Sequence, residues 1–149
     1  MKTAESILLE KNKPMLTVAS SSTLYEAICQ MEENNTGSVV VKDNDEIVGI
    51  WTEKHLLHQI AQKDIDIKKE KIKNYMSESL VKVRHDDPVY ILQDKMLGVY
   101  TRYLFVVKEE KIIGLLSIGD VLRAILNERT EQLKSVAWEY YDNWNWKKK

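Results

Sequence analysis

The chain has 149 residues, enough for a compact fold that buries about 68–70% of its unfolded surface. Hydrophobic residues make up 44% and charged residues 30% of the chain, a composition that excludes a disordered protein. The net charge of −1 argues against a nucleic-acid binder that relies on a basic field.

Neither a secretion signal nor a membrane anchor is expected. The apolar run at 7–9 is too short for a signal peptide, and no run approaches the ~18 apolar residues that a membrane helix needs. Cys29 is the single cysteine, so an intrachain disulfide is impossible. We therefore expect a cytoplasmic protein.

The first half of the chain predicts alternating strands and helices. In chain order the expected elements are a helix at 2–11, a strand at 15–18, a helix at 23–33, strands at 38–42 and 46–51, and a helix at 52–62. Thr23 and Glu26 form a capping box, and 43–45 has the composition of a hairpin turn. The charged segment 63–73 then connects to the second half.

The second half predicts the same order of elements. They are a short turn at 75–76, a strand at 81–84, a helix at 88–99, strands at 103–107 and 111–116 joined by a turn at 109–110, and a helix from Ser117 as far as Tyr141. Each half is therefore a β-α-β-β-α unit, and the last helix is extended.

The two halves are copies of one unit. Gly114 follows Gly49 by 65 positions, and at that offset 16–61 aligns with 81–126 without a gap. Identical pairs at this offset include Val18 with Val83, Tyr25 with Tyr90, Met31 with Met96, Val41 with Val106 and Leu57 with Leu122. Two copies are too few for a solenoid, so we expect an α+β fold whose repeats are related by a pseudo-two-fold axis.

The segment from Gly114 to Asp120 is the strongest local motif. Ser117 and Asp120 stand where a strand ends and a helix begins. The free N–H groups of a first helical turn can bind phosphate, and the Asp120 carboxylate can accept hydrogen bonds from ribose hydroxyls. The same pair also fits a helix-capping box in which Asp120 replaces the usual Glu or Gln. The motif alone leaves both interpretations open.

Catalytic chemistry has no positive support in the sequence. Neither of the glycine-rich phosphate loops, G-x-x-x-x-G-K-[ST] or G-x-G-x-x-G, occurs. His55 and His58 share a helix face, but a metal needs a third ligand and none stands at a useful spacing. Cys29 lies beside an apolar helix face, so we interpret it as an inert thiol. We expect neither an enzyme nor a metal site.

The chain resembles a pair of CBS domains, the small regulatory module named after cystathionine β-synthase, over about 7–133. The resemblance is closest to the stand-alone bacterial type. Several motifs carry it in order: 23–31 resembles the family's T-h-x-E-A-h-x-x-M helix, 47–55 and 112–120 its h-h-G-h-h-T-x-x-D segment, 74–77 its h-M-T/S segment, and 102–106 its R-H-h-P-V segment.

The resemblance implies a regulatory module. In the family, two repeats pair through their sheets and create two clefts that bind adenine-containing ligands such as AMP, ADP, ATP, S-adenosylmethionine or NADH. We therefore expect a sensor that binds an adenine nucleotide and signals by a conformational change. A homodimer formed through the helices and a downstream protein partner are expected, with neither nucleic acid nor membrane as a partner.

The resemblance favours the second-repeat cleft as the nucleotide site. It implies that Asp120 takes the ribose hydroxyls and Ser117 the phosphate, with Arg102 adding a charge-assisted bond. Residues implied to complete this site are Val83, Tyr103, Phe105, Gly114 and Arg123. Phe105 stands where the family often has proline, and Arg123 fits a solvated helix surface equally well.

The first-repeat cleft departs from the family pattern. His55 replaces the aspartate, and Gly37 stands where the second repeat has Arg102. A neutral imidazole offers one acceptor where a carboxylate offers several. We therefore expect a weaker second site, built from Thr52, His55, Val18 and Ser38.

Three domains are expected: 1–75 as the first repeat with its N-terminal helix and connector, 76–130 as the second repeat, and 131–149 as a helical tail. Five of the nine residues at 138–146 are Trp or Tyr. They are expected to fold back on the body or a second chain, or to dock another protein. This tail and His55 favour an alternative function, a protein-interaction or dimerisation module without a ligand.

Overall fold

The computed structural model describes residues 1–141, with side chains over 1–134. The chain divides into two compact units. The first-repeat unit holds Lys13–Val81, and the second-repeat unit holds Met1–Asn12 together with the chain from Lys82 onward. The aromatic side chains of the predicted tail at 138–146 lie outside the described side chains.

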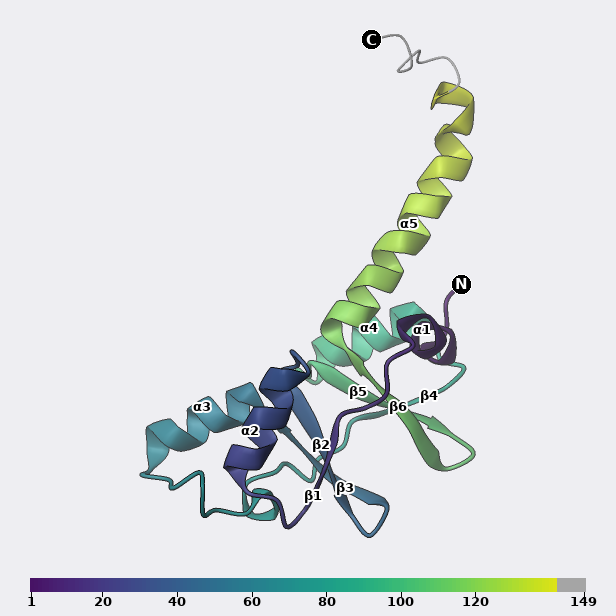
Figure 1. Cartoon of the computed structure of the whole chain (residues 1–149). Helices are drawn as coiled ribbons and strands as arrows, with labels where there is room; N and C mark the ends of the chain where they lie inside the picture. The colour runs from purple at the N-terminus through teal and green to yellow at the C-terminus, as the bar shows by residue number, and fades with distance from the viewer. Residues whose placement is uncertain (142–149) are drawn as a thin grey trace. The chain divides into compact units, whose positions relative to one another are not determined.

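The first-repeat unit is a three-stranded sheet with its two helices. Its elements are β1 (Thr17–Ala19), α2 (Leu24–Glu33), β2 (Ser38–Asp43), β3 (Glu46–Thr52), α3 (Glu53–Gln62) and the 3-10 helix η1 (Ile72–Asn74). The strand order is β1-β2-β3, with β1 parallel to β2 and β2 antiparallel to β3 (Figure 1). The core comprises Leu24, Ala27, Met31, Val39, Val41, Trp51 and Ile72.

The second-repeat unit repeats this arrangement. Its elements are α1 (Ala4–Lys11), β4 (Lys82–Arg84), α4 (Val89–Gly98), β5 (Tyr103–Lys108), β6 (Lys111–Ser117) and α5 (Ile118–Tyr141). The strand order is β4-β5-β6, again with one parallel and one antiparallel pair. The predicted α+β class, the β-α-β-β-α order of each repeat and the extended last helix are therefore confirmed.

Local chemistry explains where the elements begin and turn. The predicted capping box is present: the Glu26 backbone N–H donates to Thr23 Oγ1 at 3.1 Å, and the Thr23 N–H donates to Glu26 Oε2 at 2.9 Å. Both hairpins turn through two residues in the left-handed region, 44–45 and 109–110. Asn and Asp tolerate that conformation in the first hairpin. The Glu pair of the second is held there by the flanking antiparallel ladder.

Helix α1 belongs to the second-repeat unit, although it precedes the first repeat in the chain. It packs on β6 and on α5. The Ala4 N–H donates to the Asp87 carbonyl at 2.9 Å. Leu8 lies where a side chain at Gly114 would stand, 2.7 Å from the position of the missing Cβ. Chain order grouped this helix with the first repeat, whereas tertiary packing joins it to the second.

The segment before the second repeat packs in the first-repeat unit in a comparable way. Ser77 and Ile50 exchange two backbone hydrogen bonds, at 2.8 and 2.9 Å. Met76 lies over the bare backbone of Gly49 in β3. The last strand of each unit therefore contains one glycine, Gly49 or Gly114, whose missing side chain leaves room for a residue from another segment. Met76 takes this place in the first-repeat unit and Leu8 in the second.

We expect Gly49→Ala to lower the free energy of unfolding by about 1–3 kcal/mol, because the new Cβ overpacks the strand. It would stand 2.8 Å from Met76 Cγ and 3.0 Å from the Ser77 carbonyl oxygen, and backbone cannot move aside easily. Gly98→Ala is the matched control: a Cβ there meets nothing within 4 Å, and alanine favours the helix by up to about 1 kcal/mol. Urea denaturation followed by circular dichroism measures both. Equal stability of the two variants would contradict the packing role of Gly49.

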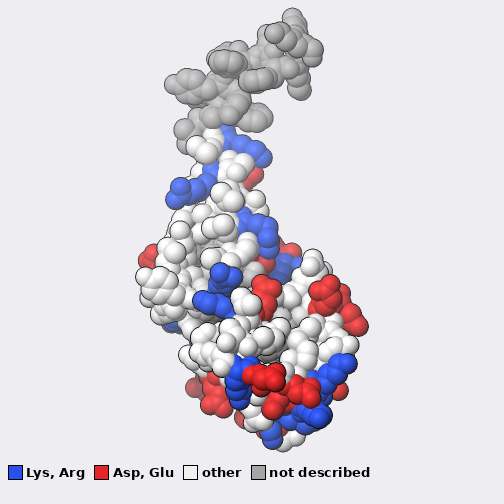
Figure 2. Space-filling model, turned by 90° about the vertical axis from the view of Figure 1, so that its left-hand side faces the viewer, with Lys and Arg blue, Asp and Glu red and all other residues white. Residues whose placement is uncertain are grey.

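The surface carries charges of both signs. Figure 2 shows acidic and basic side chains mixed on one face of the molecule, in keeping with the net charge of −1. Within the described part of the chain, each helix is too short or too polar to cross a membrane.

Candidate functional site

The predicted motif lies at the junction of β6 and α5. The Ser117 backbone N–H donates to Asp120 Oδ2 at 2.8 Å, and the Asp120 N–H donates to Ser117 Oγ at 3.2 Å. These reciprocal bonds are a capping box with aspartate in the third position. The capping interpretation of the sequence is thus confirmed, and any ligand at this site would meet a carboxylate that already has a structural task.

Two basic side chains neutralise the Asp120 carboxylate. Asp120 is only 8% exposed. The Lys11 ammonium, from α1, lies 2.8 Å from Oδ2, and the Arg123 guanidinium lies 2.9 Å from Oδ1. Lys11 also donates to the Leu115 carbonyl at 3.1 Å. The site therefore contains two cations and one anion, all within the second-repeat unit.

The environment keeps Asp120 ionised. Burial raises the pKa of the Asp120 carboxyl, but hydrogen bonds from the Lys11 ammonium and from the Ser117 backbone outweigh burial. The net pKa lies below the ordinary value for aspartate. Asp120 is consequently an anionic acceptor throughout the neutral range, which suits hydroxyl donors.

Arg102 and Tyr103 lie beside the motif through their backbone. Tyr103 pairs with Ser117 across the β5–β6 ladder, and the Ile118 N–H donates to the Arg102 carbonyl at 2.8 Å. The Arg102 side chain is exposed and Tyr103 is half-buried. The backbone of both residues therefore lies next to the start of α5, and their roles toward a ligand stay predictions.

The other residues predicted for this site lie deeper in the same sheet. Phe105 is 1% exposed and Val83 is 4% exposed, so both are core residues. Gly114 pairs with Val106 and faces Leu8 of α1. The structure brings Ser117, Asp120 and Arg123 into one helical turn, and gives Gly114 a packing role on another part of β6.

The first-repeat unit has the same backbone frame at the junction of β3 and α3. The Thr52 N–H donates to His55 Nδ1 at 3.1 Å, and the His55 N–H donates to Thr52 Oγ1 at 3.3 Å. Ser38 pairs with Thr52, and the Glu53 N–H donates to the Gly37 carbonyl at 3.0 Å. Val18, the remaining predicted residue, pairs with Val41 in the sheet. The imidazole therefore occupies the place that the carboxylate has in the second repeat.

The protonation state of His55 is coupled to this cap. Burial, followed by the nearby charges of Lys54 and His58, lowers the pKa of His55 below its ordinary 6.5. A protonated imidazole cannot accept the Thr52 N–H. The neutral ring is thus the form that caps α3.

We expect the stability of the first-repeat unit to fall as the pH drops through 6.5, the ordinary pKa of His55, toward its lower pKa in the folded protein. In the unfolded chain His55 has its ordinary pKa of 6.5, which is above its pKa in the folded protein. The stabilisation by the neutral ring is therefore fully present above pH 6.5 and is lost as the pH falls toward the folded pKa. His55→Asp keeps an acceptor for the Thr52 N–H, so its loss over this window is expected to be smaller by about 1 kcal/mol. Urea titrations at several pH values measure the difference. Parallel pH curves for the two proteins would refute this coupling.

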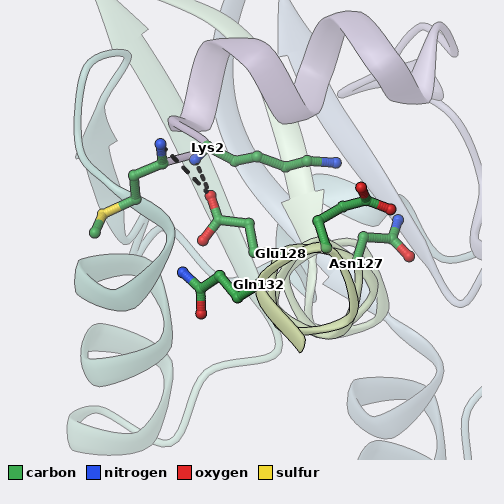
Figure 3. Close-up of a pocket in the computed structure, with 6 residues that line it drawn as sticks. Lys2, Asn127, Glu128 and Gln132 are labelled. Carbon is green, nitrogen blue, oxygen red and sulfur yellow. Dashed lines mark hydrogen bonds and ion pairs between the residues drawn. The ribbon is translucent and has the colours of Figure 1, made fainter. Parts of the chain in front are cut away.

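A pocket of about 660 Å³ opens elsewhere along α5. It is lined by Met1, Lys2, Asn127, Glu128, Glu131 and Gln132 (Figure 3). The Glu128 carboxylate accepts a hydrogen bond from the Lys2 backbone N–H and pairs with the Met1 amino group at 4.0 Å. The acidic side chain thus holds the first residues of the chain against α5. No predicted site residue lines this pocket.

Sequence reasoning missed Lys11. Lys11 is far from the motif in the sequence. Helix α1 also lies outside the repeated unit, so the alignment of the two repeats gives Lys11 no counterpart with the same role. Only the packing of α1 on β6 brings Lys11 to Asp120. Among the side chains described, those of residues 1–134, no group of three or more His, Cys, Asp or Glu could hold a metal ion.

Comparison with known proteins covers most of the chain. The family model described as the CBS domain matches residues 5–62 and 72–127. An uncharacterized 17.7 kDa protein of Acidianus ambivalens is 36% identical over 124 residues, which cover 82% of this chain and 74% of that protein. The mitochondrial CBS domain-containing protein CBSX3 of Arabidopsis thaliana is 32% identical over 124 residues, which cover 80% of this chain and 60% of that protein.

A solved structure shares the fold. It is a CBS domain protein of Pyrobaculum aerophilum complexed with AMP, and the similarity has a TM-score of 0.73 at 26% identity. The similarity covers 85% of this chain and 97% of that chain.

Proposed function

Because this chain belongs to the CBS domain family, we propose that it is a regulatory module that binds an adenine nucleotide of the AMP, ADP or ATP class. The observation that carries the proposal is the pair formed by Ser117 and the ionised Asp120 at the start of α5. The AMP complex of the Pyrobaculum aerophilum protein, which shares the fold, supports the ligand class. The regulatory role is proposed from the two CBS domains that the family model matches.

Each group at this site suits a different part of a nucleotide: the ribose, the phosphate or the base. Asp120 accepts the ribose hydroxyls, because a carboxylate has about four lone-pair positions and three are used within the unit. Ser117 accepts from the Asp120 N–H and keeps its own O–H to donate to phosphate. Arg102 adds an exposed cation from the residue just before β5. Tyr103 offers a half-buried ring to the base, whereas Val83 and Phe105 contribute through backbone.

The corresponding place in the first repeat is a weaker site or an unused one. His55 Nδ1 already accepts the Thr52 N–H, so the neutral ring has no second acceptor for a hydroxyl. A signal requires that the ligand bind one conformation of the protein better than another, because only differential affinity shifts an equilibrium.

The experiment that tests the proposal is a thermal-shift panel with AMP, ADP, ATP, S-adenosylmethionine and NADH. A ligand that binds only the folded state adds about 2.7 kcal/mol of stability at a hundredfold excess over Kd. We expect a rise in the unfolding midpoint with a nucleoside phosphate. No rise with any of the five compounds would reject nucleotide binding.

An exposed apolar stripe on α5 favours a second candidate function, self-association or partner docking. Ile118, Leu122, Leu126 and Leu133 are between 46% and 67% exposed. Their spacing places them on one face of the helix. A homodimer formed over this stripe is the arrangement we propose. Sedimentation of the parent, Leu126→Lys and the off-stripe control Asn127→Lys tests it, and a parent that stays monomeric at all concentrations would reject it.

A further inference from the structure

We propose that Lys11 and Arg123 make the second-repeat site selective for nucleosides with a 5′ phosphate. Nucleosides whose 5′ group is neutral or cationic are expected to bind more weakly. This inference rests on the proposed function and adds the determinant of ligand class. Lys11 comes from α1, outside the repeat, so the selectivity is a property of this chain and not of the repeat motif alone.

Donors around Asp120 already occupy most of its acceptor positions. Both carboxylate oxygens already accept charge-assisted hydrogen bonds, from Lys11 at 2.8 Å and from Arg123 at 2.9 Å. The Ser117 N–H uses a third acceptor position. A ribose diol brings two more donors to a group with about one free position. Ribose binding therefore displaces at least one of the two cations.

A displaced cation in a partly buried site needs a new anion. A phosphate attached to the ribose carries that anion to the same place and forms charge-assisted hydrogen bonds with Lys11 or Arg123. A neutral 5′ group offers the displaced cation no such bond, so the ion pair with Asp120 is lost without replacement. A sulfonium group adds a third cation and repels the other two.

The two cations differ in mobility. The Arg123 side chain is 71% exposed, so its guanidinium leaves Asp120 more readily than the Lys11 ammonium does. Lys11 is 25% exposed and is also held by the Leu115 carbonyl, so it stays near the carboxylate. Arg123 already reaches back over the first turn of α5: its Nη1 lies 3.4 Å, and Ser117 Oγ 3.6 Å, from where a Cβ of Gly119 would be. The guanidinium and the hydroxyl thus flank the same bare backbone, where a phosphate would meet both.

The first repeat serves as an internal comparison. At the same offset, His55 replaces Asp120 and His58 replaces Arg123. The same backbone frame there has no carboxylate at the cap and no guanidinium one turn on. Phosphate selectivity is therefore assigned to the second repeat only.

Calorimetric titration of the full chain with AMP, adenosine and 5′-methylthioadenosine tests the proposal. The variants are Lys11→Gln, Arg123→Gln and the double variant, and Lys69→Gln is a control for net charge on an exposed ion pair of the other unit. We expect the parent and the control to bind AMP about 100-fold more tightly than either nucleoside. Each single variant is expected to bind AMP only about tenfold more tightly. In the double variant AMP and adenosine bind within a few fold of each other.

Each other outcome has a definite meaning. If the double variant keeps the full preference for AMP, Lys11 and Arg123 are not the determinants, although nucleotide binding stands. If the parent binds 5′-methylthioadenosine as tightly as AMP, the selectivity itself is wrong. If the parent binds none of the three compounds, the proposed function fails, and the inference fails with it.

Discussion

Replacing Asp120 with alanine is expected to lower nucleotide affinity by at least about 100-fold, because two hydrogen bonds to a charged acceptor are lost. The same change is expected to lower the free energy of unfolding by about 1–3 kcal/mol. It leaves the Ser117 N–H without its acceptor and Lys11 with only the Leu115 carbonyl.

Two control variants separate binding from folding. Asp120→Asn keeps a carbonyl oxygen for the Ser117 N–H but removes the charge, so we expect a smaller loss of stability with most of the loss of affinity. His55→Ala changes the matching position of the first repeat and is expected to leave nucleotide affinity within about threefold. Titration calorimetry and thermal unfolding measure the two effects. Unchanged AMP affinity in a folded Asp120→Ala protein would remove Asp120 from the site.

Replacing Trp51 with alanine is expected to lower the free energy of unfolding by about 3–5 kcal/mol, because it empties the centre of the first-repeat core. Trp51 is 0% exposed. Its Nε1 donates to Gln59 Oε1 at 2.9 Å, and Gln59 Nε2 donates to the Tyr75 carbonyl at 2.8 Å. The variant therefore loses both packing and the indole link to the loop after α3.

The loss is expected to be confined to one unit. Hydrogen exchange followed by mass spectrometry should show faster exchange over 13–81 and little change in the second-repeat unit. Leu57→Ala is the matched control, since Leu57 is 73% exposed and its removal is expected to cost less than about 0.5 kcal/mol. A Trp51→Ala protein as stable as the Leu57→Ala protein would contradict the core assignment.

Most of the fold was predictable because its signals are local. The capping pair Thr23 and Glu26 spans three residues, and each hairpin depends on a two-residue turn between two short Val- and Ile-rich strands. The offset between Gly49 and Gly114 exposed the repeat. Family resemblance then supplied the candidate site, and the pair of Ser117 with Asp120 is present as a cap.

The partners of the site residues were not predictable in the same way. Arg123 stands three positions after Asp120, a spacing that brings helix side chains together, yet a solvated position fitted it equally well. Lys11 carried no signal, because an ion pair between residues 109 positions apart depends on how distant segments pack. Phe105 and Val83 proved to be core residues: Leu104, Phe105 and Val106 are buried in succession, so both faces of β5 are covered, which a motif does not reveal.

The repeated β-α-β-β-α order, the cap at Ser117 and the long last helix could be predicted from the amino-acid sequence, because they follow from periodicity and contacts within a few residues. The packing of α1 in the second-repeat unit and the neutralisation of Asp120 by Lys11 were evident only in the folded protein. They depend on the bare backbone of Gly114: it admits Leu8, Leu8 anchors α1 on β6, and the helix then brings an ammonium group to a buried carboxylate. Long-range packing of this kind has no periodic pattern in the chain, so it appears only when the elements are assembled.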